Sequence, residues 1–400
     1  MCAQCGAHVH CGQMNRRELV RGGIVAAGAL ALAGTGWVEA LGAPAQTGAG
    51  PYGPLRAADR NGLELPAGFT SRIVARSRSL VGGYVWHDAP DGGACFPTST
   101  GWVYLSNSEL PAGTGGVGAI RFRRDGVVER GYRVLRGTTG NCAGGVTPWH
   151  RWLSCEEAPR GRVWECDPAA AVRPVARPAM GVFQHEAATC DADLRVVYLT
   201  EDRPDGCLYR FRPVTWGDLS RGVLEVFCLA AQTGRGSWQR VPDPLASSRD
   251  TRFQVAAARA FAGGEGACYS GVTRSLFFTT KGDGRVWRLD TRTSTLEVYY
   301  DDSAVAGSPP LTGVDNVIVS RSQDVYVAED GGSLDVCLIT PDRVVSRFFH
   351  LNGHSGSEIT GIAFAPTHDR MYFSSQRGTT GRSRDGVTFE VRGPFRSVAG

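Results

Sequence analysis

Acidic residues recur at one step of a repeated sequence pattern, directly after an apolar run. The three clearest cases are acid pairs: Glu156 with Glu157, Glu201 with Asp202, and Glu329 with Asp330. Each preceding run has the length and the β-branched and aromatic content of a strand. Carboxylate oxygens in such numbers are ligands for hard cations, so the pattern predicts metal binding, with Ca²⁺ as the first candidate.

A second set of polar residues opens the copies of the same pattern. The set consists of Cys142, Glu186, Glu265, Asp315 and Glu358. Without cations, so many converging carboxylates would repel one another and would lose solvation. The thiolate of Cys142 is a soft donor and indicates a transition metal beside calcium, although a buried thiol without metal is the alternative. His185 could be a ligand, the partner of a ligand or a core histidine.

The elements that must position these residues recur six times. Their central positions lie 45 to 49 residues apart, with one interval of 79, at Tyr104, Leu153, Tyr198, Phe277, Tyr326 and Tyr372. The long interval indicates an insertion at about residues 216–262. A period in the forties with several short strands predicts an all-β, six-bladed β-propeller over residues 62–400. A β-sandwich would explain the strands but not the period. In a propeller the first strand of every blade lines one channel, so the polar residues would form a ring.

Composition agrees with this architecture and excludes some functions. The 400 residues carry a net charge of +4 without a Lys/Arg block, so we expect no nucleic-acid partner. The 53 glycines and the charged fraction of 20% favour short strands and tight turns over long amphipathic helices. We expect a monomer.

The first 45 residues have the character of a leader. Paired Arg16 and Arg17 precede a weakly apolar run, and Ala43-Pro44-Ala45 offers a cleavage site, which together predict a twin-arginine export signal at 14–45. Met14 is the expected start, so residues 1–13 would be untranslated. A transmembrane anchor and a zinc site before Met14 are the alternatives. The prediction is an exported protein, periplasmic or extracellular, that uses the twin-arginine machinery, keeps no membrane span after processing and has a linker at 46–61.

Several motifs resemble those of the PhoX-type alkaline phosphatases. They are Asn141-Cys-Ala-Gly-Gly-Val-Thr-Pro-Trp, Trp152-Leu-Ser-Cys-Glu-Glu, His185-Glu-Ala-Ala, Tyr198-Leu-Thr-Glu-Asp-Arg-Pro-Asp-Gly-Cys, Asp315-Asn, Ala328-Glu-Asp-Gly and Ser357-Glu-Ile-Thr-Gly. The resemblance runs from about Gly62 to the C-terminus, and it implies a short variant of a family of exported propellers. Such proteins hold Ca²⁺ and Fe³⁺ and hydrolyse phosphate monoesters by attack of a metal-activated oxide or hydroxide.

The resemblance also implies roles for single residues. Cys142 would ligate ferric iron, and Glu186 and Glu265 would bridge iron and calcium, so these three would be catalytic. The remaining expected ligands are Glu156, Glu157, Glu201, Asp315, Glu329, Asp330 and Glu358.

One departure from the family concerns the substrate. Members carry a phosphate-binding arginine just before the Glu-Gly that corresponds to Glu265, and this chain has Gly263 and Gly264 there. The candidates to bind a small phosphate ester instead are Arg203, Lys281 and Arg377. A calcium-dependent lactonase or esterase and a non-catalytic, metal-stabilised binding propeller are the alternative functions.

Overall fold

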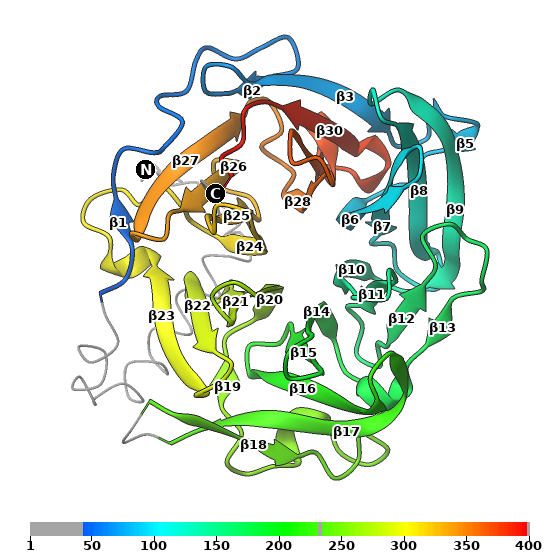
Figure 1. The fold of residues 1–400 in the computed structure, drawn as a ribbon, viewed down its shortest axis with the longest axis vertical. Coiled ribbons are helices and arrows are strands. Elements are labelled where there is room, and N and C mark those ends of the chain that lie inside the picture. The colour runs from blue at the N-terminus through cyan, green and yellow to red at the C-terminus, as the bar shows by residue number, and fades with distance from the viewer. Residues whose placement is uncertain (1–42, 231–233, 398–400) are drawn as a thin grey trace, which may run out of the picture.

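Six β-sheets stand around a central channel in the computed structural model, which describes residues 43–230 and 234–397 (Figure 1). The predicted six-bladed, all-β propeller is confirmed. Blade 1 consists of β6 (Pro90–Thr98), β7 (Gly101–Ser108), β8 (Gly115–Arg123) and β9 (Val128–Thr138). Blade 2 consists of β10 (Asn141–Val146), β11 (Trp152–Glu156), β12 (Val163–Cys166) and β13 (Val175–Ala176).

The third and fourth blades follow in chain order. Blade 3 consists of β14 (His185–Asp191), β15 (Val196–Glu201), β16 (Gly206–Thr215), β17 (Asp218–Leu229) and β18 (Gly236–Arg240), with β19 (Ala260–Phe261) beside β16. Blade 4 consists of β20 (Gly264–Ser270), β21 (Ser275–Thr280), β22 (Arg285–Asp290) and β23 (Thr295–Asp301). The expected insertion at 216–262 thus contains β17, the fourth strand of blade 3, so part of it belongs to the propeller itself.

The last two blades take strands from the N-terminal part of the chain. Blade 5 consists of β24 (Val314–Val319), β25 (Val325–Glu329), β26 (Asp335–Ile339) and β27 (Val344–Leu351), with β1 (Gln46–Thr47) and β2 (Leu63–Glu64) along β27. Blade 6 consists of β28 (Ile359–Phe364), β29 (Arg370–Ser375), β30 (Val387–Arg392) and β3 (Thr70–Arg76). The pairing of β3 with β30 closes the ring (Figure 1).

Short elements complete the described chain. A hairpin of β4 (Leu80–Val81) and β5 (Tyr84–Val85) lies between β3 and β6, and the 3-10 turns are η2 (Pro178–Met180), η3 (Thr251–Phe253), η4 (Asp302–Ala304), η5 (Gly378–Thr380) and η6 (Ser383–Asp385). The stretch 46–61, expected to be a linker, holds β1, which pairs with β27 in parallel. In the described ranges no helix has the length and apolarity needed to cross a bilayer. The arginine pair of the expected leader lies outside these ranges.

The apolar core lies between neighbouring blades. The six central positions of the sequence repeat are all buried, with exposed fractions of 0 to 4%. Tyr104 stacks on Tyr372 with ring centroids 4.9 Å apart, which joins blade 1 to blade 6 across the closure. All nine cysteines of the described chain are free thiols.

A register shift occurs near the start of the innermost strand in every blade. The shifts lie between Pro90 and Gly93, Asn141 and Gly144, His185 and Ala188, Gly264 and Ala267, Val314 and Val317, and Thr360 and Ala363. A β-bulge bends the strand and redirects a side chain. The inner strands also approach one another closely, since a Cβ on Gly92 would lie 2.5 Å from Ala143 Cα. The bulges therefore set which residues face the channel mouth.

Candidate metal centre at the channel mouth

Five of the six bulges place an acid or a thiol at the first bulged position. These residues are Asp91, Cys142, Glu186, Glu265 and Asp315, and blade 6 has Gly361 at that step. Glu358 supplies the carboxylate of blade 6 from the residues just before β28. A cavity of about 770 Å³ lies over this ring, and all of these residues except Glu186 and Gly361 line it.

The turn after the second strand of each blade contributes an outer ring. Its members follow the last strand residue directly: Glu109, Glu157, Asp202, Lys281, Asp330 and Gln376. The first five line the same cavity, together with Arg203 and Arg377. Two residue positions per blade, repeated by the fold, therefore supply most of the charged residues that line the pocket.

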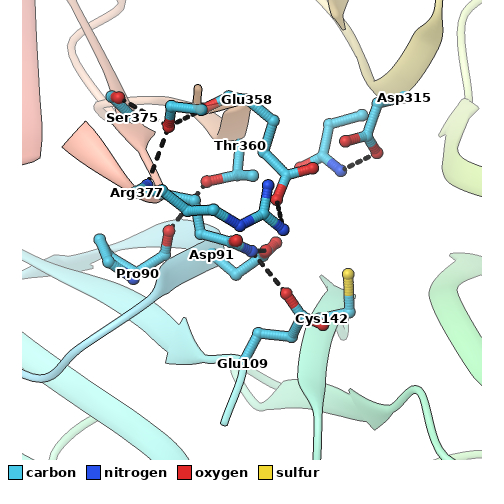
Figure 2. Close-up of polar contacts among 12 residues, drawn as sticks. Pro90, Asp91, Glu109, Cys142, Asp315, Glu358, Thr360, Ser375 and Arg377 are labelled. Atoms are coloured by element: carbon cyan, nitrogen blue, oxygen red, sulfur yellow. Dashed lines mark hydrogen bonds and ion pairs between the residues drawn. The ribbon is translucent and has the colours of Figure 1, made fainter. Parts of the chain in front are cut away.

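Three carboxylates from the first and last blades form one candidate ligand group. Asp91, Glu109 and Glu358 each bring an oxygen within 4.8 Å of the others (Figure 2). Gln376 donates from Nε2 to Asp91 Oδ2 at 2.5 Å and to Glu109 Oε2 at 2.6 Å. Arg377 pairs with Glu358 Oε1 at 2.7 Å (Figure 2). An all-oxygen group of this kind suits a hard ion such as Ca²⁺.

The second group contains the thiol. Cys142, Glu157 and Glu186 bring their ligand atoms within 4.8 Å of one another, and Cys142 Sγ lies 3.2 Å from Glu186 Oε1. Asn107 fixes the backbone here, since its amide donates to the carbonyls of Cys142 and Ala143 at 2.9 Å each. A mixed sulfur and oxygen set suits a transition metal better than calcium.

The third group shares Glu186 with the second. Glu186, Glu265 and Asp315 have ligand atoms within 4.8 Å of one another, and all three residues are buried. Glu186 is fully buried, and its Oε2 has no hydrogen-bond partner. Asn316 orients the neighbouring carboxylate by donating to Asp315 Oδ1 at 2.8 Å. A buried carboxylate oxygen without a donor calls for an explanation, and a cation held by the three carboxylates would supply the missing partner.

Burial and mutual repulsion shift the ionisation of these groups. The pKa of Glu157 rises to about 8 because the carboxyl is buried and faces Asp202 and Glu109. Burial and Asp330 raise the pKa of Asp315 to about 7. Burial, with Asp91 and Glu186 nearby, raises the pKa of the Cys142 thiol well above its usual value. Bound cations would offset the cost of burying these ionised groups and the repulsion between them. The donor set therefore fits calcium and a transition metal.

The first member of each acid pair faces away from the cavity. Glu156 accepts hydrogen bonds from the backbone N–H groups of Thr139 and Arg162, at 3.0 and 3.1 Å. Glu201 accepts from Cys207 N and the hydroxyl of Tyr209, and Glu329 accepts from the N–H groups of Thr312 and Asp335. These three expected ligands lie at strand ends, where successive side chains point to opposite faces of the sheet. Their carboxylates face away from the cavity and accept the hydrogen bonds described above.

The three expected phosphate-binding cations all line the cavity. Lys281 lies 2.7 Å from Asp202 Oδ2 and 2.5 Å from Glu265 Oε1, and Arg377 is paired with Glu358. Arg203 forms no ion pair in the described part of the chain, its Nε is without a partner, and its Nη1 lies 3.5 Å from Gln184 Oε1. Of the three, Arg203 is thus the one that no carboxylate of the described chain pairs with.

Two ring members were missed in the sequence. Asp91 opens an Asp-Gly-Gly that corresponds to the Cys-Ala-Gly-Gly of Cys142, and Glu109 follows its strand at the same step as Glu157. The correspondence between these motifs could have shown both.

His185 is a core histidine: its ring stacks on that of Phe183 with centroids 3.6 Å apart, and burial lowers its pKa to about 4.

The other end of the inner strands encloses a second cavity of about 340 Å³. Small and apolar residues such as Ala143, Ala267 and Val317 line most of it. Among the described residues its lining also holds the thiols of Cys95, Cys190 and Cys268 but no carboxylate, so the carboxylates of the channel gather at the acidic mouth.

The fold and this pocket define a six-bladed propeller with a carboxylate and thiol cluster at one channel mouth. The model of the family Alkaline phosphatase PhoX matches residues 107–164 and 158–294, so the matched part spans Cys142, Glu186 and Glu265. The chain therefore resembles this family over residues 107–294, and the resemblance that the sequence motifs predicted is confirmed.

The solved structures with TM-scores of 0.50 and above agree on the fold. Pseudomonas fluorescens PhoX in complex with vanadate is 16% identical, with a TM-score of 0.68 over 88% of this chain and 97% of that chain. A protein of unknown function from Bacteroides thetaiotaomicron is 9% identical, with a TM-score of 0.50 over 81% of this chain and 76% of that chain. A gluconolactonase from Xanthomonas campestris is 16% identical, with a TM-score of 0.48 over 86% of this chain and 99% of that chain. No curated protein matches the sequence.

Proposed function

We propose that this protein is a metal-dependent phosphatase that hydrolyses phosphate monoesters. The observation that carries the proposal is the cluster of buried carboxylates around Cys142, in a cavity whose lining holds eight acids and three cations. The match to the PhoX family model over residues 107–294 supports it, and so does the likeness in fold to a PhoX in complex with vanadate, a transition-state analogue. The thiol favours this function over a calcium-dependent lactonase, because a site for calcium alone gains nothing from a sulfur ligand.

The proposed ligand set follows the three groups of the pocket. Cys142, Glu157 and Glu186 would hold Fe³⁺, with Glu265 and Asp315 sharing the ion or its neighbour, and Asp91, Glu109 and Glu358 would hold Ca²⁺. Asp330 stays a candidate ligand because it lines the cavity, whereas Glu156, Glu201 and Glu329 are left out of the set. When bound, such ions polarise phosphoryl oxygens, activate water as a nucleophile and stabilise the developing charge.

The chain's own side chains would position the ester. Arg203 stands at the cavity wall with an unpartnered Nε, and a guanidinium can donate two parallel hydrogen bonds to a phosphate. Arg377 enters from the opposite wall, on the side of blade 6. These two would orient the phosphate, while the buried floor around Glu186 keeps bulk water from the reacting centre.

Metal analysis and turnover of p-nitrophenyl phosphate at alkaline pH test the function together. We expect calcium and iron in the purified protein, turnover that chelation abolishes, and loss of turnover in Glu265→Gln. Glu129→Gln is the matched control, since Glu129 lies on the outer strand β9 and pairs with Arg121 at the surface. A protein that binds both metals but hydrolyses lactones or nothing would contradict the proposal.

The proposed place of action is outside the cytoplasm. Arg16, Arg17 and the apolar run that follows support export through the twin-arginine machinery, with processing near Ala45 and a monomeric, membrane-free product. Fractionation of cells that express the chain, compared with an Arg16→Lys/Arg17→Lys variant, tests this. The variant is expected to stay in the cytoplasm.

A further inference from the structure

Lys281 is the single lysine in this chain, against 42 arginines. It stands in the outer ring of the channel mouth, at the step where four other blades carry Glu109, Glu157, Asp202 and Asp330. The chain thus uses the guanidinium group for every other basic side chain and places one compact ammonium among carboxylates. An ammonium is a point charge that can sit between two carboxylates, whereas a guanidinium needs a planar, forked partner.

The contacts of Lys281 are those of a small cation. Its Nζ lies 2.7 Å from Asp202 Oδ2 and 2.5 Å from Glu265 Oε1, so it bridges an outer-ring acid of blade 3 and an inner-ring acid of blade 4. Asp202 belongs to none of the three candidate ligand groups, and Glu265 belongs to the third. The ammonium therefore neutralises Asp202, which lies outside the three groups, together with one carboxylate of the third group.

The backbone around Lys281 holds the side chain in this place. Lys281 N donates to Gly263 O at 2.9 Å, and Gly282 N donates to Ala262 O at 2.8 Å. Gly263 has a φ of +71°, and a Cβ there would lie 3.0 Å from Lys281 Cγ and 3.3 Å from Asp202 Oδ1. The lysine stem crosses the space that a side chain at position 263 would fill.

We propose that Lys281 is a tethered cation of the metal centre, which takes the place of a divalent ion between Asp202 and Glu265. The inference rests on the proposed metal centre and goes beyond it, because it concerns the number of ions that the ring holds. The unpartnered Glu186 Oε2, fully buried beside Glu265, shows separately that the ring is built for cations. Removal of the ammonium should leave Asp202 and Glu265 as ligands for an additional ion.

Calcium stoichiometry of three proteins tests this. Wild type, Lys281→Met and Lys281→Arg are each stripped with chelator, dialysed against Ca²⁺ and measured by elemental analysis. We expect Lys281→Met, which keeps the stem but loses the charge, to bind one more Ca²⁺ per chain than wild type. Lys281→Arg keeps a positive charge beside the two carboxylates, although its forked group fits them less closely than the ammonium, and it should bind the same number as wild type. An equal or smaller number in Lys281→Met would overturn the inference.

A second measurement needs no variant. Lysine labelled with ¹³C at Cε gives one side-chain NMR signal in this chain, so the signal reports Lys281 alone. We expect it to differ from that of a solvated lysine both without metal and with saturating Ca²⁺. A shift to the solvated value on adding Ca²⁺ would show that the metal displaces the ammonium, and it would refute a resident cation. If wild type binds no metal at all, the proposed function fails, whereas metal binding with unchanged stoichiometry refutes the role of Lys281 alone.

Discussion

Cys142 is the one sulfur donor among the described residues that line the acidic cavity, and its position depends on a buried hydrogen-bond network. Asn107 donates to the carbonyl of Cys142 and accepts from Trp152 Nε1 and from the hydroxyl of Ser154, at 2.9 Å each. The thiol is therefore held by the second strands of blades 1 and 2. Because the thiol itself takes no part in this network, a substitution that removes only the sulfur should leave the local fold in place.

Replacement of the thiol should remove iron and leave the fold intact. We expect Cys142→Ala to lower iron affinity by about 100-fold or more, because the site would lose one of its three proposed ligands. Iron content and the absorption band of thiolate bound to Fe³⁺ are the measurements. Cys95→Ala is the matched control, since Cys95 lies on β6 and lines the opposite cavity. Unchanged iron content in Cys142→Ala would contradict the proposed ligand.

The adjacent acids Glu156 and Glu157 should behave differently. Glu157 faces the cavity, so Glu157→Gln should weaken metal binding roughly 10–100-fold with little change in folding stability. Glu156 holds two backbone N–H groups, so Glu156→Gln should lower the free energy of unfolding by about 1–3 kcal/mol without changing the metal count. Denaturant titration and elemental analysis of both variants check this. The opposite pattern would show that Glu156 binds the metal and Glu157 stabilises the fold.

These acids also show how far the sequence could predict the site. The pairs indicated a ring of carboxylates, and Glu186, Glu265, Asp315 and Glu358 do line or adjoin one cavity. The pattern could not tell which member of a pair faces the channel, because neighbouring residues on a strand point to opposite sides and the strand ends were unknown. The prediction of both Glu156 and Glu157 as ligands, and of Glu201 without Asp202, therefore lacked the strand register, which only the structure supplies.

At the scale of elements, the bulge at the start of each inner strand sets the geometry. The repeat period predicted six blades, and the buried aromatic positions such as Tyr104 and Tyr326 confirm that the apolar pattern marks the second strands. The bulges of the inner strands have no sequence signal as clear as the apolar repeat, apart from small residues. The residue at which each bulge occurs could therefore not be predicted. Gly92 and Gly266 lie directly after bulged acids, where a Cβ would come within 2.5 and 2.6 Å of the neighbouring inner strand.

A side chain at such a glycine should disturb the metal centre. A Cβ at position 92 would lie 2.5 Å from Ala143 Cα and 2.6 Å from Cys142 O, so Gly92→Ala must push β10 away. We expect a loss of about 1–3 kcal/mol in unfolding free energy and weaker iron binding. Gly271→Ala is the matched control because the nearest atom to its Cβ is 3.9 Å away. Equal metal content and equal stability in both variants would contradict this account of the bulge.

At the scale of the whole molecule, the acid cluster links stability to pH and to metal. The pKa of Glu157 is about 8 and that of Asp315 about 7, whereas both are near 4 in an unfolded chain. Between about pH 4 and pH 8 the metal-free native state therefore binds more protons than the unfolded state. Its stability should fall as the pH rises through this window.

Calcium should reverse that dependence, because it binds the deprotonated carboxylates of the native state. We expect the Tm of chelated protein to decrease from pH 5 to pH 8, and the Tm with saturating Ca²⁺ to stay level or increase. Calorimetry at matched ionic strength measures both series. A chelated protein that is most stable at pH 8 would show that the carboxylates do not carry raised pKa values.

The closure of the ring has a consequence for the order of events during synthesis. Strand β3 must wait for β30, which is made more than 300 residues later, and the group Asp91, Glu109 and Glu358 draws its members from both sides of that seam. A growing chain on the ribosome cannot assemble this group, however much of blades 2 to 5 has already folded. The calcium ion proposed there can be taken up only by a finished chain, so its uptake would mark the last step of maturation.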